Sequence, residues 1–110
     1  MAVPQKYRIQ LVLGDAYELV VSYVDTLGEA IDLDSEAITH TFYDNDEVVL
    51  ALTEGNGITV SGPAGIITTA LTSVQVAAFL GLTDVRHSLR LDTSETTILY
   101  GVVDLWQNSW

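Results

Sequence analysis

Two histidines, His40 and His87, are the side chains best suited to metal or acid–base chemistry in this chain of 110 residues, which has no cysteine. Both fall at apolar positions of alternating segments, His40 between Ile38 and Phe42, and His87 before Leu89. They could meet across a core as two metal ligands or as hydrogen-bonded core residues. A zinc site uses three or four ligands, and the sequence offers no obvious third one. We therefore expect hydrogen-bonded core histidines and no bound metal.

Two acidic clusters place carboxylates at alternate positions, and carboxylate oxygens are the ligands that calcium prefers. They are Asp32-Leu33-Asp34-Ser35-Glu36 and Asp44-Asn45-Asp46-Glu47. Neither has the glycine at the sixth position or the late bidentate glutamate of a calcium loop. Solvated turns explain both clusters. Calcium is kept as the alternative because a strongly acidic chain attracts cations.

Enzymatic motifs are missing from the sequence. There is no Gly-x-Ser-x-Gly elbow for a serine nucleophile. The segment Gly55-Asn56-Gly57 lacks the helix and the lysine that a phosphate loop needs, and a hairpin turn explains it better. Paired carboxylates for glycoside hydrolysis require a cleft, which a chain of this length has little scaffold to build. We therefore predict a non-enzymatic protein without a cofactor, whose function is carried by a surface.

The acidic composition of the chain limits the kinds of molecule that it is expected to bind. Four Lys and Arg residues stand against fifteen Asp and Glu residues, which gives a net charge of −11 and an isoelectric point near 4.1. Such a surface repels phosphate backbones, so nucleic acid is not an expected partner. No run approaches the roughly 18 apolar residues of a membrane span, and the N-terminal residues lack the apolar core of a signal peptide. The absence of cysteine is consistent with folding in a reducing cytoplasm.

Alternating apolar residues, separated by turn residues, dominate the chain and predict short strands. Hydrophobic residues make up 48% and charged residues 17%, which is typical of one compact domain with a single core. We expect an all-β, two-sheet antiparallel sandwich of about 7–8 strands. The acidic stretch Ala30–Glu36 is expected to cross from one sheet to the other. The strands are expected to begin near Tyr7, Tyr17, Ile38, Val48, Ile58, Ile66, Val85 and Thr96.

One segment changes from the strand period to the helix period. Thr72 and Gln75 have the spacing of a capping box, in which each side chain bonds the other residue's backbone. We expect a helix over about residues 73–80, with three apolar residues at i, i+3 and i+4 on one face. Because two turns are too short to be stable alone, the helix is expected to plug the end of a sheet. The three apolar residues are Val76, Phe79 and Leu80.

The last two expected strands differ in pattern. In the first, Val85, His87, Leu89 and Leu91 alternate with polar residues, as in a half-buried strand. The second, Thr96–Leu105, is apolar on both faces, which predicts a strand that is central or covered on both sides. Gly101 in its middle predicts a bulge or a close backbone approach.

The order of several short motifs carries a resemblance that covers nearly the whole chain. The motifs are Gly14-Asp15, Asp25-x-x-Gly28, Ile31-Asp32-Leu33, Gly57-Ile58-Thr59-Val60, Gly65-Ile66-Ile67-Thr68, Leu71-Thr72-x-x-Gln75, His87-x-Leu89-x-Leu91 and Tyr100-Gly101-Val102-Val103. In this order of motifs the chain is similar to a family of small tailed-bacteriophage virion proteins, which includes the N-terminal domain of upper baseplate proteins and short tail or head accessory proteins. The resemblance implies an Ig-like β-sandwich and a structural role. The family usually has an aromatic residue in place of His87 and often Thr-Gly in place of Asp34-Ser35.

The two ends of the chain are the expected interaction segments. We divide the chain into an extended arm at residues 1–6, a sandwich at 7–105 and a C-terminal tail at 106–110. Tryptophan is enriched at interface hot spots, and the tail has two of them. The alternative is that the first folds back on the sandwich and the second is merely terminal. The candidate interface residues are Val3, Pro4, Trp106 and Trp110.

From the resemblance we expect a tail, baseplate or fibre adaptor of a virion, made in the host bacterial cytoplasm. It is expected to contact other phage structural proteins and copies of itself through strand edges and terminal segments. One alternative is a head decoration protein. Another is a carbohydrate- or receptor-binding module, in which aromatic residues supply stacking platforms for a glycan. Those residues are Tyr7, Tyr17, Tyr23, Tyr43 and the two tryptophans.

Overall fold

The computed structural model describes residues 5–24, 27–34, 36–93 and 95–107. Among these residues no helix is long and apolar enough to cross a membrane. The described part measures 45 × 22 × 22 Å. In chain order its elements are β1 (Gln5–Lys6), β2 (Ile9–Leu13), β3 (Tyr17–Ser22), β4 (Ile38–Asp44), β5 (Glu47–Glu54), β6 (Gly57–Ser61), β7 (Ile66–Leu71), α1 (Ser73–Ala77), β8 (Val85–Leu91) and β9 (Thr96–Gln107).

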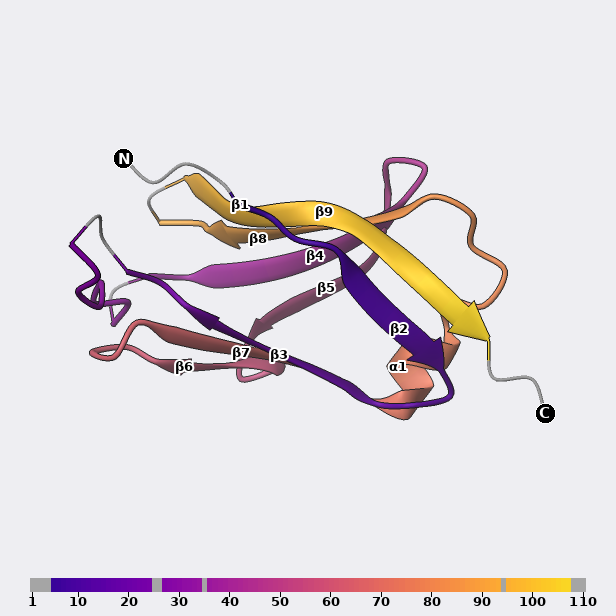
Figure 1. Cartoon of the computed structure of the whole chain (residues 1–110), viewed down its shortest axis with the longest axis horizontal. Helices are drawn as coiled ribbons and strands as arrows, with labels where there is room; N and C mark the ends of the chain where they lie inside the picture. Colours follow the sequence, from indigo (N-terminus) through magenta and orange to yellow (C-terminus); the bar gives the residue numbers. More distant parts are fainter. Residues whose placement is uncertain (1–4, 25–26, 35, 94, 108–110) are drawn as a thin grey trace.

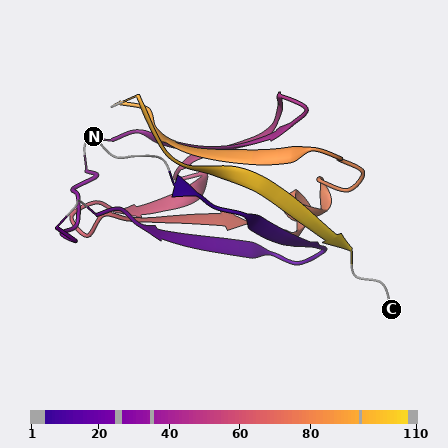
Figure 2. The same ribbon diagram turned by 45° about the horizontal axis from the view of Figure 1, so that its top comes forward.

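The strands form two layers that face each other (Figure 1 and Figure 2). The front layer contains β1 and β2 beside β9, then β8, β4 and β5, and the back layer contains β6, β7 and β3. A short parallel contact pairs Thr53 with Gly57 and Glu54 with Ile58, and it joins the layers at one corner. The segment between β3 and β4 crosses from the back layer to the front one, as expected. This two-layer strand order makes the protein an all-β, Ig-like sandwich.

The core lies between the layers and is almost entirely apolar. Inward residues alternate with outward ones along β4 and β8, as their sequences predicted. Only three polar side chains are buried with the apolar ones, namely His40, Thr69 and His87, among the described residues. The largest fully buried apolar side chains are Phe42, Phe79, Ile9, Leu11, Leu33, Ile38, Leu52, Ile58, Ile67, Leu71 and Leu89.

The N-terminal strands differ from the expected all-antiparallel arrangement. β1 pairs in parallel with β9 at Leu99 and Tyr100, and β2 pairs in parallel with β9 from Val103 to Gln107. Part of the expected arm, Gln5–Lys6, is therefore a strand of the sheet. A parallel partner far away in the sequence leaves no local turn signal, so alternation within each strand could not reveal this pairing.

Two β-bulges, one in β5 and one in β9, change which side chains of these strands face the core. In the β4–β5 ladder Phe42 pairs with Leu50 and Tyr43 pairs with Val48, so Val49 is the extra residue. The strand expected to begin near Val48 alternates in sequence with Leu50, but the bulge turns Val48 to the outer face, where it is 61% exposed. In the β8–β9 ladder the register shifts in the same way, and Ile98 is the extra residue.

The helix is shorter than expected. The capping box is confirmed, because the Gln75 N–H donates to the Thr72 hydroxyl and the Gln75 side chain accepts from the Thr72 N–H. The α-helix ends at Ala77, and the next turns are held by i→i+3 bonds. Such a tighter turn rotates Leu80 off the expected face, so that Phe79 is fully buried while Leu80 is 61% exposed.

β9 runs two residues beyond the expected end of the sandwich. Trp106 and Gln107 are its last residues and pair with Val12 and Leu13 of β2, so the expected tail begins inside a strand. The expectation of a strand central in its sheet is confirmed. Of the two alternatives the central position holds and coverage on both faces does not, because Tyr100 is 44% exposed on the outer face.

Candidate functional site

The two histidines meet in the core, on neighbouring strands of the front layer. In the β4–β8 ladder His87 lies opposite Phe42 and His40 lies opposite Leu89, so the two rings are diagonal neighbours. His40 Nε2 lies 3.0 Å from His87 Nδ1. The other ring nitrogen of His40 lies 2.9 Å from the Thr69 hydroxyl of the back layer. The buried polar groups therefore connect the two layers.

The backbone carbonyl of Tyr7 fixes the direction of every hydrogen bond in this chain of groups. His87 Nε2 lies 2.7 Å from the Tyr7 oxygen, which can only accept, so His87 must carry its proton on Nε2. Neutral His87 then accepts at Nδ1 from His40 Nε2–H, and His40 accepts at Nδ1 from the Thr69 hydroxyl. Each ring nitrogen has one partner and both rings are neutral. We call this chain of four groups the histidine relay.

Burial keeps the relay uncharged. Burial, with a smaller contribution in the same direction from nearby His87, lowers the pKa of His40 to about 3. Burial also lowers the pKa of His87, against the opposing effect of its hydrogen bond to the Tyr7 carbonyl. Because the hydrogen bonds occupy all four ring nitrogens, neither ring has a lone pair directed at a metal. The expectation of hydrogen-bonded core histidines is confirmed, and the described residues contain no group of three or more potential metal ligands.

Gly101 allows the N-terminal segment to approach the relay. It lies opposite His87 in the β8–β9 ladder, and a Cβ built on it would collide with the backbone of Tyr7. The Tyr7 N–H donates to the Tyr100 carbonyl at 2.8 Å. The close backbone approach predicted at Gly101 is therefore confirmed, and its partner is the residue whose carbonyl orients His87.

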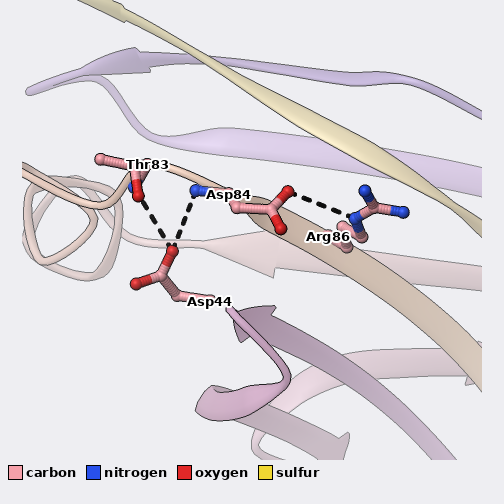
Figure 3. Close-up of polar contacts among 4 residues, drawn as sticks. All are labelled: Asp44, Thr83, Asp84 and Arg86. Atoms are coloured by element: carbon pink, nitrogen blue, oxygen red, sulfur yellow. Dashed lines mark hydrogen bonds and ion pairs between the residues drawn. The ribbon is translucent and has the colours of Figure 1, made fainter.

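The acidic clusters bond to the backbone around them. Asp44 Oδ1 accepts from the backbone N–H groups of Thr83 and Asp84, at 3.3 and 3.0 Å (Figure 3). This contact ties the turn between β4 and β5 to the segment that precedes β8. In the other cluster Asp32 Oδ1 accepts from the Asp34 N–H at 2.9 Å, which is a local turn. Both observations agree with the turn interpretation.

The outer face of the front layer carries a groove of about 350 Å³, lined by charged, aromatic and apolar residues. Four strands contribute to it, β1, β4, β8 and β9, together with the turn that joins β4 to β5 and the residue that precedes β8. Arg86 Nε donates to Asp84 Oδ1 at 3.3 Å along one wall, and Figure 3 shows its other two nitrogens turned away from Asp84. The groove is lined by Lys6, Tyr43, Asp46, Asp84, Arg86, His87, Tyr100, Gly101 and Val102.

All four cationic side chains of the chain belong to this layer. Lys6 and Arg8 lie in the N-terminal segment beside β9, and Arg86 and Arg90 lie on the outward face of β8. The three arginines each have an acidic partner, at 3.2 Å for Arg8 and Asp104, 3.3 Å for Arg86 and Asp84, and 3.6 Å for Arg90 and Asp92. Lys6 forms no ion pair with another described residue. The front layer is therefore the one part of a strongly acidic protein where positive charge is available.

Sequence reasoning missed this groove. Tyr43 was considered only as one of several dispersed aromatic residues, and Tyr100 only as part of an apolar strand. One signal was present: the cations fall at positions 6, 8, 86 and 90, so alternation placed Arg86 and Arg90 on one face. The pairing of β1 with β9, which brings Lys6 beside Tyr100, had no sequence signal.

The expected interface residues are placed only in part. Trp106 lies on β9 directly opposite Val12 of β2, and both side chains are exposed. We call Val12 and Trp106 the terminal patch. The other three expected residues, Val3, Pro4 and Trp110, lie outside the described residues.

No protein-family model matches the chain, and no curated protein matches it. A solved structure with a similar strand arrangement is that of the NK cell receptor Nkp44, described as a triggering partner in natural cytotoxicity. The two are 10% identical, the match covers 92% of this chain and 98% of that one, and the TM-score is 0.45. A likeness at this level carries no argument about function.

Proposed function

We propose that the protein is a non-enzymatic structural component of a tailed-bacteriophage virion, an adaptor in the tail, baseplate or fibre. Its partners in this proposal are other virion proteins and copies of itself. The order of motifs in the sequence supports the class of protein. The supporting feature of the structure is an interaction surface at the end of β9, argued below.

The terminal patch is the observation that carries the proposal. Trp106 is 56% exposed, and Val12 beside it is 36% exposed. Exposing an indole to water is unfavourable, and tryptophan is the residue most enriched among binding hot spots. Because Trp106 is held by strand pairing and not in a loose tail, little conformational entropy is lost when a partner covers it.

The same end of β9 offers an open strand edge. The ladder between β8 and β9 ends where Arg86 pairs with Val102, and β9 continues for five more residues with β2 on its other side. A hollow of about 260 Å³ separates these residues from the segment Leu82–Val85. An open edge accepts an added strand from another chain, which is a recurring mode of protein assembly.

The test is incorporation into particles. Virus particles purified from the source culture are expected to contain the chain in a fixed ratio to the other structural proteins, by mass spectrometry, and cryo-electron microscopy is expected to place it in the tail. Density in the head would favour the decoration alternative. Absence from purified particles would exclude a virion role.

Two variants test the surface itself, each supplied to particles that lack the native chain. Trp106→Ser is expected to be excluded from particles, while Leu80→Ser, which removes a side chain of similar exposure that is not part of the terminal patch, is incorporated normally. Deleting residues 108–110 leaves β9 complete and tests the contribution of Trp110. Equal incorporation of Trp106→Ser and native chain would refute the role of the patch.

A further inference from the structure

The groove on the front layer contains several polar groups that no neighbour in the described part of the chain uses. Lys6 and Asp46 form no ion pair and no side-chain hydrogen bond there. Arg86 uses only Nε on Asp84, so both of its Nη atoms are available. The groove therefore presents donors from Lys6 and Arg86 and an acceptor from Asp46 within one concave surface.

The charges in the groove cancel. Two cationic side chains, Lys6 and Arg86, are balanced by two carboxylates, Asp46 and Asp84. An anionic ligand would meet both carboxylates, and a cationic ligand would meet both cations, so either would be opposed at close range. A ligand that carries hydroxyl groups matches both signs, because a hydroxyl accepts from a cation and donates to a carboxylate.

Two aromatic rings complete this chemistry. Tyr43 and Tyr100 line the groove from β4 and β9, and Tyr100 is 44% exposed. Aromatic faces pack against the apolar C–H faces of a ring while their hydroxyl groups stay in water. His87 contributes to the wall of the groove but offers no hydrogen bond to a ligand, because it is 2% exposed and both of its ring nitrogens are already bonded.

We propose that this groove binds a neutral saccharide, with one sugar ring packed on Tyr100 and its hydroxyl groups bonded to Lys6, Arg86 and Asp46. A volume of about 350 Å³ suits a short saccharide, since it lies at the small end of the range for ligand pockets. The site goes beyond the assembly role proposed above and does not depend on it. The groove is a second binding surface, separate from the terminal patch.

The experiment is a titration of the full, isotopically labelled chain followed by NMR. The probes are glucose, galactose, N-acetylglucosamine and rhamnose as neutral sugars, with glucuronate and glucosamine as their charged counterparts. Each is added to about 0.1 M, a range that covers millimolar dissociation constants. At least one neutral sugar is expected to give saturable shifts confined to the backbone amides of the groove, those of Lys6, Tyr43, Arg86, Tyr100 and Gly101.

Matched variants show whether the shifts report this site. Tyr100→Leu and Arg86→Ala are each expected to weaken binding about tenfold or more. Arg90→Ala is the control, because Arg90 lies on the same strand and the same face as Arg86 but outside the groove, and it is expected to leave the affinity unchanged. The amide spectrum of each variant shows whether the fold is retained.

Three outcomes would overturn the proposal. They are no saturable shift with any neutral sugar, shifts with glucuronate or glucosamine alone, and equal weakening by Arg90→Ala and Arg86→Ala. Because the titration uses the isolated chain, its failure would leave the assembly role intact, and absence of the chain from virus particles would leave this site intact.

Discussion

The burial of the two histidines could be predicted from the sequence, but the hydrogen bonds that connect them could not. Alternation placed His40 and His87 in the core, and the absence of a third ligand favoured hydrogen bonds over a metal. Their connection could not be predicted, because it depends on the register of β4 against β8 and on the approach of Tyr7, a residue 80 positions away from His87. Thr69, which completes the relay from the back layer, had no distinguishing signal in the sequence.

The neutral relay makes stability depend on pH. Burial lowers the folded-state pKa of His40 from 6.5 to about 3, so below pH 6.5 the unfolded chain binds protons that the folded protein does not. The stabilisation is therefore complete above about pH 6.5 and is lost as pH falls toward 3. For His40 alone the free energy of unfolding is expected to drop by about 2 kcal/mol between pH 7 and pH 5. Urea denaturation at both values measures it.

The control for this prediction replaces both rings with neutral amides. The double variant His40→Gln and His87→Gln keeps hydrogen-bond donors and acceptors but cannot titrate. Its free energy of unfolding is therefore expected to fall much less between pH 7 and pH 5 than that of the native protein. NMR titration of the native protein gives a second measurement, in which the His40 ring is expected to stay neutral at pH 5. A His40 ring that titrates near pH 6.5 in the folded protein would contradict the prediction.

Thr69 is expected to stabilise the fold through the hydrogen bond of its hydroxyl group and not through the volume of its side chain. Thr69→Val keeps the shape but leaves the Nδ1 acceptor of His40 buried without a donor, which is expected to lower the free energy of unfolding by about 1–3 kcal/mol. Thr68→Val makes the same chemical change on the outer face of the same strand and is expected to alter it by less than about 0.5 kcal/mol. Equal effects in chemical denaturation would show that the Thr69 hydroxyl is not stabilising.

The helix illustrates how far local sequence determines an element. The capping box was predicted correctly because it depends on residues three positions apart. The end of the helix was not, because the change to i→i+3 bonds after Ala77 depends on how Phe79 fits between the layers. The strands follow the same rule. Their inward faces were predictable from alternation, while the bulges at Val49 and Ile98 and the pairing of β1 and β2 with β9 depend on contacts distant in sequence.

Phe79 and Leu80 allow the role of the helix to be tested with adjacent residues. Phe79 is fully buried at the end of the sandwich, so Phe79→Ala is expected to lower the free energy of unfolding by about 3–5 kcal/mol. Leu80 is 61% exposed, so Leu80→Ala is expected to change it by no more than about 0.5 kcal/mol. Urea denaturation of the two variants measures the difference. A cost for Leu80→Ala as large as that for Phe79→Ala would mean that the helix buries both residues, as the sequence pattern alone had indicated.

The whole molecule combines an acidic surface with cations confined to the front layer. Composition predicted the acidity, and alternation predicted the sandwich, but neither located the groove or the terminal patch. Both of these surfaces form where the N-terminal strands lie against β9. Lys6 reaches the groove through the pairing of β1 with β9, and Val12 meets Trp106 through the pairing of β2 with β9. The contact that local sequence could not predict is thus the one that builds the surfaces proposed for binding.

Net charge decides how copies of the protein can assemble. Each chain carries −11 at pH 7, so two copies repel. The Debye length is about 30 Å at 0.01 M salt and about 3 Å at 1 M, so the repulsion acts across the 22 Å width of the molecule only at the lower concentration. If copies associate through the terminal patch, raising the concentration of NaCl is expected to promote association, as measured by sedimentation velocity, and Trp106→Ser is expected to abolish it. A monomer under both conditions would argue against self-assembly, and the terminal patch would then need a different partner. A basic partner would show the opposite salt dependence, because screening weakens attraction between unlike charges.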